Sequence, residues 1–150
     1  MRILMVCLGN ICRSPLAEGI MQRKITQLGL NWTVDSAGTG AWHAGEKPDP
    51  RSIEVAKING LDISMQKARQ FSEGDFKNFD LILAMDSSNY SDLVNKTDSE
   101  KERAKVKLIM NFKDQGMNVN VPDPYWNNDG FSHVYNMLEE ACQKVIEVFG

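Results

Sequence analysis

The sequence has few cysteines, no long apolar run and no excess of basic charge. Three cysteines in 150 residues are too few for a disulfide framework, so we expect reduced thiols in a cytoplasmic protein. No apolar run approaches the roughly 20 residues that cross a bilayer, and the N-terminus lacks the features of a secretory signal, so we expect no membrane partner. Seventeen basic residues against 20 acidic ones, without a basic stripe, exclude nucleic acid as an expected partner.

Apolar runs alternate with helical patterns along the whole chain, and we find neither a repeat nor a linker. Residues 1–150 are therefore expected to form one domain, whose 42% hydrophobic composition suffices for a layered core. The expected strands are residues 2–6, 32–36, 79–85 and 106–109. The expected helices are residues 15–28, a helix opened by Asp49 and Pro50 that ends at residues 59–60, a short one from Ser87 or Ser88, and residues 131–149. This order predicts an α/β fold with a parallel doubly wound sheet, which binds ligands at the carboxyl ends of its strands.

Local signals place the ends of these elements. Ser14 is a candidate N-cap for the first helix, and Gly29 predicts its end. Residues 37–50 contain three glycines and two prolines, so we expect the whole segment to be a loop.

The segment CLGNICRS, residues 7–14, stands where the first strand gives way to the first helix. Free N–H groups at a helix N-terminus bind a tetrahedral oxyanion and stabilise a thiolate, which makes Cys7 a candidate nucleophile. Arg13 can fork two N–H donors onto phosphoryl oxygens, and its charge replaces that of a metal. Gly9 allows close approach of the backbone, and Asn10 tolerates a left-handed conformation. The expected phosphate-binding residues are Leu8, Gly9, Asn10, Ile11, Cys12, Arg13 and Ser14.

Four segments carry a resemblance to a known family. VCLGNICRSP, with DSAGT at 35–39, MDSSN at 85–89 and DPY at 123–125, resembles the low-molecular-weight protein tyrosine phosphatases over essentially the whole chain. The resemblance implies a single three-layer domain, in which helices flank both faces of a four-stranded parallel doubly wound sheet. It also implies hydrolysis of phosphotyrosine proteins or aryl phosphates through a phosphocysteine intermediate, with no metal or cofactor. Phosphate is then the product and a competitive inhibitor.

A general acid is required to protonate the leaving group, and Asp123 in VPDPY is the candidate. Two prolines hold this aspartate in a stiff loop. An aspartate flanked by prolines is ordinarily a turn residue, but the resemblance favours the catalytic interpretation. The expected catalytic residues are therefore Cys7, Arg13 and Asp123.

Two further cysteines differ in their interpretation. Cys12 lies in the same loop as Cys7, and two interpretations stay open: a packing residue, or the partner in a reversible disulfide as in the family. Cys142 lies on the apolar side of the last helix and is expected to be core.

Supporting residues are expected behind the loop. Besides Ser14, whose hydroxyl can donate to the cysteine sulfur, Ser36 resembles the family serine that hydrogen-bonds the loop asparagine. Asp86 resembles an aspartate that supports the site from the third strand. Some relatives have a histidine that pairs with the glutamate matching Glu18; this chain has Gln66 there, so we expect that coupling to be absent.

Aromatic side chains in two polar loops are candidate walls for the substrate. Trp42, Tyr125 and Trp126 could stack on a phenyl ring and favour phosphotyrosine over the shorter phosphoserine. His43 and His133 are interpreted as exposed residues rather than ligands.

Four other functions use similar residues. An arsenate reductase needs further cysteines beyond the third strand, and residues 80–95 contain none. A phosphocysteine carrier would not need an aspartate placed for hydrolysis. A phosphopeptide-binding module needs neither a thiolate nor an acid. A zinc site fails because Cys7 and Cys12 lack the usual ligand spacing.

Overall fold

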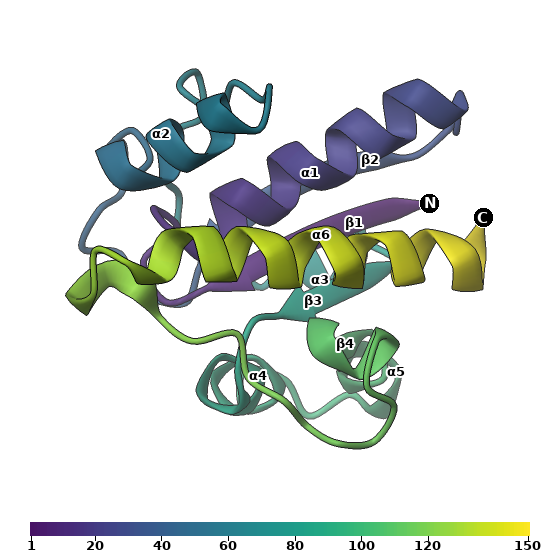
Figure 1. Cartoon of the computed structure of the whole chain (residues 1–150). Coiled ribbons are helices and arrows are strands. Elements are labelled where there is room, and N and C mark those ends of the chain that lie inside the picture. Colours follow the sequence, from purple (N-terminus) through teal and green to yellow (C-terminus); the bar gives the residue numbers. More distant parts are fainter.

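Four short strands run parallel to one another in one sheet (Figure 1). They are β1 (Arg2–Cys7), β2 (Thr33–Gly38), β3 (Leu81–Ala84) and β4 (Val106–Leu108), in the order β2-β1-β3-β4. The computed structural model describes all of residues 1–150. Because β2 adds to one side of β1 and β3 to the other, the sheet reverses its order beside β1. The predicted parallel doubly wound sheet is confirmed, and the end of β1 is where a ligand is expected.

Helices cover both faces of the sheet. They are α1 (Arg13–Leu28), α2 (Pro50–Ile58), α3 (Asp75–Asn78), α4 (Ser87–Val94), α5 (Glu100–Arg103) and α6 (Gly130–Phe149), with 3₁₀ turns at Ile109–Phe112 and Pro124–Trp126. The side chains of β1 alternate between two cores: Ile3 and Met5 pack with α1, α2 and α6, whereas Leu4 and Val6 pack with α3 and α4. This alternation confirms the three-layer α/β fold. No helix is both long enough and apolar enough to cross a membrane.

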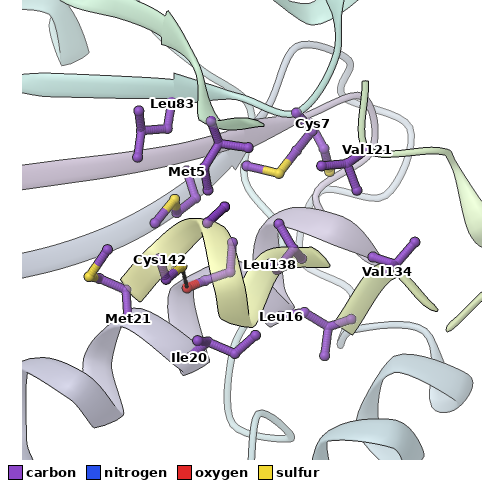
Figure 2. Close-up of a cluster of buried hydrophobic side chains, with 14 of the residues drawn as sticks. Met5, Cys7, Leu16, Ile20, Met21, Leu83, Val121, Val134, Leu138 and Cys142 are labelled. Atoms are coloured by element: carbon purple, nitrogen blue, oxygen red, sulfur yellow. Dashed lines mark hydrogen bonds between the residues drawn. The ribbon is translucent and has the colours of Figure 1, made fainter. Parts of the chain in front are cut away.

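The larger core lies between the sheet and the pair α1 and α6. Figure 2 shows Met5 and Leu83 of the strands facing Ile20 of α1 and Leu138 of α6. Cys142 is fully buried here, and its thiol lies 3.9 Å from the carbonyl oxygen of Ala17, as expected of a core residue. Cys7 belongs to the same cluster, so the main core supports the end of β1 directly.

Most element ends follow the sequence signals. Asp49 caps α2 by accepting a hydrogen bond from the backbone N–H of Arg51, and Pro50 occupies the first helical position. Gly29 ends α1 with a left-handed φ of 64°. Helix α3 was not predicted, because four residues are too few to show a helical period.

Two local predictions are wrong. Ser14 does not cap α1: the helix begins at Arg13, the cap position is Cys12, and no side chain caps it. Ala37 and Gly38 are not loop residues, because they extend β2 and pair with Val6 and Cys7 of β1. A glycine is needed in this strand since a Cβ at Gly38 would lie 2.8 Å from the carbonyl oxygen of Leu8.

We therefore expect Gly38→Ala to lower the free energy of unfolding by about 1–3 kcal/mol, because the new methyl group meets backbone atoms that cannot move aside. Urea denaturation measures the change. Gly74→Ala is the matched control: φ there is −61°, and the nearest atom to a Cβ is Ser72 Oγ at 4.0 Å. This control should be neutral or slightly stabilising. An unchanged midpoint for Gly38→Ala would contradict the prediction.

Candidate active site

The loop between β1 and α1 curls around the sulfur of Cys7. We call residues 7–14 the phosphate loop. The backbone N–H of Asn10 donates to Cys7 Sγ at 3.3 Å, and Ser14 Oγ lies 3.0 Å from the same atom. When Cys7 is a thiolate, Ser14 must be the donor because a thiolate has no proton to give. Two donors therefore stabilise negative charge on the sulfur.

Asn10 holds the loop in its curled form. Its φ is 57°, in the left-handed region. Its side-chain N–H₂ donates to Ser14 Oγ at 2.8 Å and to Ser36 Oγ at 3.0 Å, while its carbonyl oxygen accepts from the backbone N–H of Arg69 at 3.0 Å. A strained backbone conformation persists only where its surroundings fix it, and these bonds do so.

Arg13 is a buried cation between three acidic or anionic groups. Its side chain is 3% exposed; Nη1 donates to Asp86 Oδ2 at 2.6 Å and to the carbonyl oxygen of Val121 at 3.0 Å. Nη2 lies 3.7 Å from Asp123 Oδ2. Burial acts to lower the pKa of Arg13, but the negative charges of Cys7, Asp86 and Asp123 outweigh it and raise the pKa. The guanidinium therefore stays charged.

Cys7, Arg13 and Asp123 meet in one cavity of about 260 Å³. It is lined by Cys7, Leu8, Gly9, Ile11, Cys12, Arg13, Trp42, His43, Asp123, Tyr125 and Trp126. Asn10 and Ser14 of the loop do not line it, nor do Ser36 and Asp86; the hydrogen bonds of these four residues hold the loop and Arg13 in place. A larger cavity of about 650 Å³ lies beside β4 and the end of α6 and contains none of the predicted catalytic residues. The smaller cavity is therefore the candidate active site.

Aromatic side chains form the rim of this cavity. Trp42 is 73% exposed and Trp126 is 85% exposed. The rings of Tyr125 and Trp126 meet edge to face, with centroids 4.8 Å apart. The three predicted wall residues thus surround the same opening.

His43 also lines the cavity. It lies in a turn, as expected, but its side chain is only 31% exposed. The His43 ring lies so close to Gly9 that a Cβ added there would be 3.1 Å from a ring carbon. Nδ1 of His43 lies 2.8 Å from Glu46 Oε2. The one available signal in the sequence was its position next to Trp42. His133, in contrast, is exposed on α6.

Cys12 lies between the cavity and the main core. Burial, followed by the negative charges of Asp49, Cys7 and Asp123, raises the pKa of Cys12 to about 12. Its thiol is therefore neutral at pH 7, unlike a thiolate nucleophile. Because Cys12 both packs in the core and lines the cavity, the packing and redox interpretations both stay open.

Glu18 extends the network behind the loop. Ser36 Oγ donates to Glu18 Oε1 at 2.6 Å. Burial raises the pKa of Glu18 from its ordinary value of 4.5 to about 7, although the bond from Ser36 acts to lower it. Gln66 donates to the carbonyl oxygen of Pro15 and makes no hydrogen bond to Glu18. Glu18 therefore has no charged partner of the kind that a histidine would provide.

A thiol and a buried arginine between a central strand and a helix define the class: a three-layer α/β protein with a cavity at the carboxyl end of its central strand. The family model described as low molecular weight phosphotyrosine protein phosphatase matches residues 2–149. The protein with that name from Schizosaccharomyces pombe is 45% identical over 150 residues, which are 97% of this chain and 95% of the relative. This chain belongs to the low molecular weight phosphotyrosine protein phosphatase family, whose members are phosphoric monoester hydrolases.

Solved structures agree with this assignment. A crystal structure of protein tyrosine phosphatase from Entamoeba histolytica, with Hepes in the active site, has a TM-score of 0.91 and 39% identity, covering 98% of this chain and 95% of that one. The structure of a Drosophila arginine phosphatase has a TM-score of 0.92 and 32% identity, covering 99% and 98%. Solved structures with this fold thus include proteins that are named for different substrates.

The raised pKa of Glu18 predicts a pH-dependent stability. Between pH 4.5 and about 7 the folded state holds a proton on Glu18 that the unfolded chain releases, so stability falls as pH rises through this range. We expect the wild type to lose about 2–3 kcal/mol more than Glu18→Gln between pH 5 and pH 8, measured by urea unfolding. Glu54→Gln, at an exposed position of α2, should follow the wild type. Parallel curves for the wild type and Glu18→Gln would contradict the prediction.

Proposed function

We propose that this protein hydrolyses phosphotyrosine and other aryl phosphate monoesters through a phosphocysteine intermediate, with an aspartate general acid and neither metal nor cofactor. The observation that supports it most directly is that Cys7, Arg13 and Asp123 line one cavity. Family membership supports a phosphoprotein substrate and phosphate as product and competitive inhibitor. A reducing, cytoplasmic setting belongs to the proposal, since Cys7 must remain a thiol.

In the first step the phosphoryl group binds in the phosphate loop. Backbone N–H groups and the Nη2 side of Arg13 hold the non-bridging oxygens, while the Cys7 thiolate attacks phosphorus in line. The S–P bond forms and the ester P–O bond breaks. Asp123 gives its proton to the departing phenolate oxygen, so that a neutral phenol leaves.

In the second step water attacks the phosphocysteine. The Asp123 carboxylate takes a proton from this water, the new P–O bond forms, and the S–P bond breaks. The electron pair returns to the Cys7 sulfur, where the N–H of Asn10 and the hydroxyl of Ser14 stabilise the thiolate. Inorganic phosphate leaves and Asp123 is again protonated for the next turnover.

The rim favours an aromatic leaving group. Trp42, Tyr125 and Trp126 offer faces and edges on which a phenyl ring can stack, with a gain of about 0.5–1.5 kcal/mol per ring pair. Phosphoserine has no ring and a shorter reach to the loop. Phosphoarginine is a useful comparison substrate, because a structurally similar protein is named an arginine phosphatase.

Hydrolysis of p-nitrophenyl phosphate in EDTA with a reductant tests the nucleophile. We expect turnover to persist in EDTA and to fall on the order of 10⁴-fold or more in Cys7→Ser, since serine has no thiolate at neutral pH. Cys142→Ala, which removes a cysteine from the core, should retain the activity. Phosphotyrosine peptides should be cleaved faster than phosphoserine peptides and phosphoarginine. Undiminished turnover in Cys7→Ser would overturn the proposal, and a stable phosphoenzyme without release of phosphate would indicate a carrier instead.

Leaving-group dependence tests the general acid. Asp123→Asn should lower kcat/KM for phenyl phosphate about 10²-fold or more, and for p-nitrophenyl phosphate much less, because nitrophenolate leaves without a proton. Steady-state kinetics with both substrates measure the difference. Equal losses for the two substrates would remove Asp123 from this role.

A further inference from the structure

One arginine joins α2 to the segment that follows the proposed general acid. Arg51, in the first turn of α2, donates from Nη1 to Asn128 Oδ1 at 2.5 Å. Its Cζ lies 5.4 Å from the ring centroid of Tyr125 and 4.7 Å from that of Phe131. A planar guanidinium suits this combination, because it can donate in its plane and stack through its faces.

The other edge of Arg51 is fixed to Asp49. Nε and Nη2 donate to the two carboxylate oxygens of Asp49 at 3.0 Å and 2.9 Å. These hydrogen bonds hold the pKa of Asp49 below its usual value and raise that of Arg51, so the pair stays ionised at neutral pH. Both charges are therefore present under the conditions of catalysis.

Asp49 is in turn attached to the phosphate loop. Its backbone N–H donates to the carbonyl oxygen of Ile11 at 2.8 Å. One turn into α2, Ser52 Oγ donates to the carbonyl oxygen of Cys12 at 3.2 Å. The start of α2 thus binds the phosphate loop and also carries Arg51.

The segment that carries Asp123 is fixed at its beginning and packs through the buried Pro124 and through Tyr125, but it makes few other hydrogen bonds to the rest of the molecule. We call residues 121–130 the acid loop. At its beginning the N–H of Val121 donates to the carbonyl oxygen of Met85, and the carbonyl oxygen of Val121 accepts from Arg13. Beyond Asp123, all other hydrogen bonds of residues 124–129 are local, so the bond from Arg51 to Asn128 is the one that joins them to another element.

We infer that Arg51 is a positioning residue that holds the acid loop against the phosphate loop, so that Asp123 stays within reach of the leaving-group oxygen. This inference rests on the proposed function of Asp123. Arg51 lies outside the set that lines the cavity, and the phosphate loop is held to α2 by the backbone of Asp49 and the hydroxyl of Ser52, so we expect Cys7 and Arg13 to stay in place when Arg51 is replaced. Proton donation should suffer selectively, because it depends on the placement of a single carboxyl group in a loop.

Kinetics of Arg51→Gln with two substrates test this role. We expect kcat/KM for phenyl phosphate to fall roughly tenfold more than kcat/KM for p-nitrophenyl phosphate, since a carboxyl group that is no longer held donates its proton less often. Arg2→Gln, at an exposed position on the far end of β1, is the matched arginine control and should change neither value.

A double-mutant cycle separates positioning from a general structural effect. In the Asp123→Asn background, Arg51→Gln should cause no further selective loss with phenyl phosphate, because the group it positions is already absent. If Arg51→Gln causes as large an extra fall in kcat/KM for phenyl phosphate in that background as in the wild type, the inference is wrong. The inference would also be wrong if Asp123→Asn loses more kcat/KM for phenyl phosphate than for p-nitrophenyl phosphate while Arg51→Gln loses the same for both. That outcome would leave the proposed function intact. A lack of selectivity in Asp123→Asn itself would overturn the general acid and this inference together.

Asn128→Ala provides a second route to the same answer. It removes the acceptor of Arg51 from an exposed loop position, so the core and the phosphate loop are unaffected. We expect kcat/KM to fall more for phenyl phosphate than for p-nitrophenyl phosphate, with an unchanged midpoint of urea denaturation. If Arg51→Gln fails to fold, Asn128→Ala decides. A larger fall in kcat/KM for phenyl phosphate supports the role of Arg51, and an equal change for both substrates overturns it.

Discussion

The left-handed backbone at Asn10 is the constraint on which the rest of the site depends. It turns the backbone N–H of this residue toward the sulfur of Cys7, and the side chain of the same residue fixes the turn through Ser14, Ser36 and the backbone of Arg69. Asn10 donates three hydrogen bonds and accepts one, and together they offset the strain of its backbone conformation. Because these partners come from α1, β2 and the segment beyond α2, this form of the loop depends on those three parts of the chain being in place.

A second constraint is the buried charge of Arg13. An unpaired guanidinium would be costly away from water, so its position depends on Asp86 and on the carbonyl oxygen of Val121. Asp86 also caps α4 by accepting from the N–H of Asn89. One ion pair therefore joins α1, the end of β3, α4 and the beginning of the acid loop. The same arginine that meets the substrate's charge in the proposed reaction also organises the packing around it.

A third feature is the way in which Glu18 supports the phosphate loop. Glu18 is half-buried and makes no ion pair, and burial disfavours its ionised form and raises its pKa to about 7. The hydrogen bond from Ser36 still links it to the network behind Cys7. The structure thus retains a titratable group at the back of the site at the expense of stability above neutral pH.

The sequence by itself determined most of the helices and strands and the residue types that the candidate site contains. The apolar run of β1 and the spacing from Cys7 to Arg13 placed the candidate nucleophile at a strand-to-helix junction. Asp49 and Pro50 located the start of α2, and the paired prolines around Asp123 located the candidate acid. These features are local in the chain, because periodicity, capping and proline restrict the backbone within a few residues.

Only the tertiary structure decided which distant groups meet. Serine is a common N-cap residue, but the hydroxyl of Ser14 faces Cys7 because the curled loop brings the sulfur within 3.0 Å. His43 enters the cavity, and Arg51 reaches Asn128 across 77 positions of sequence. No local pattern encodes such contacts, since they depend on the order of strands in the sheet and on how the helices pack against it.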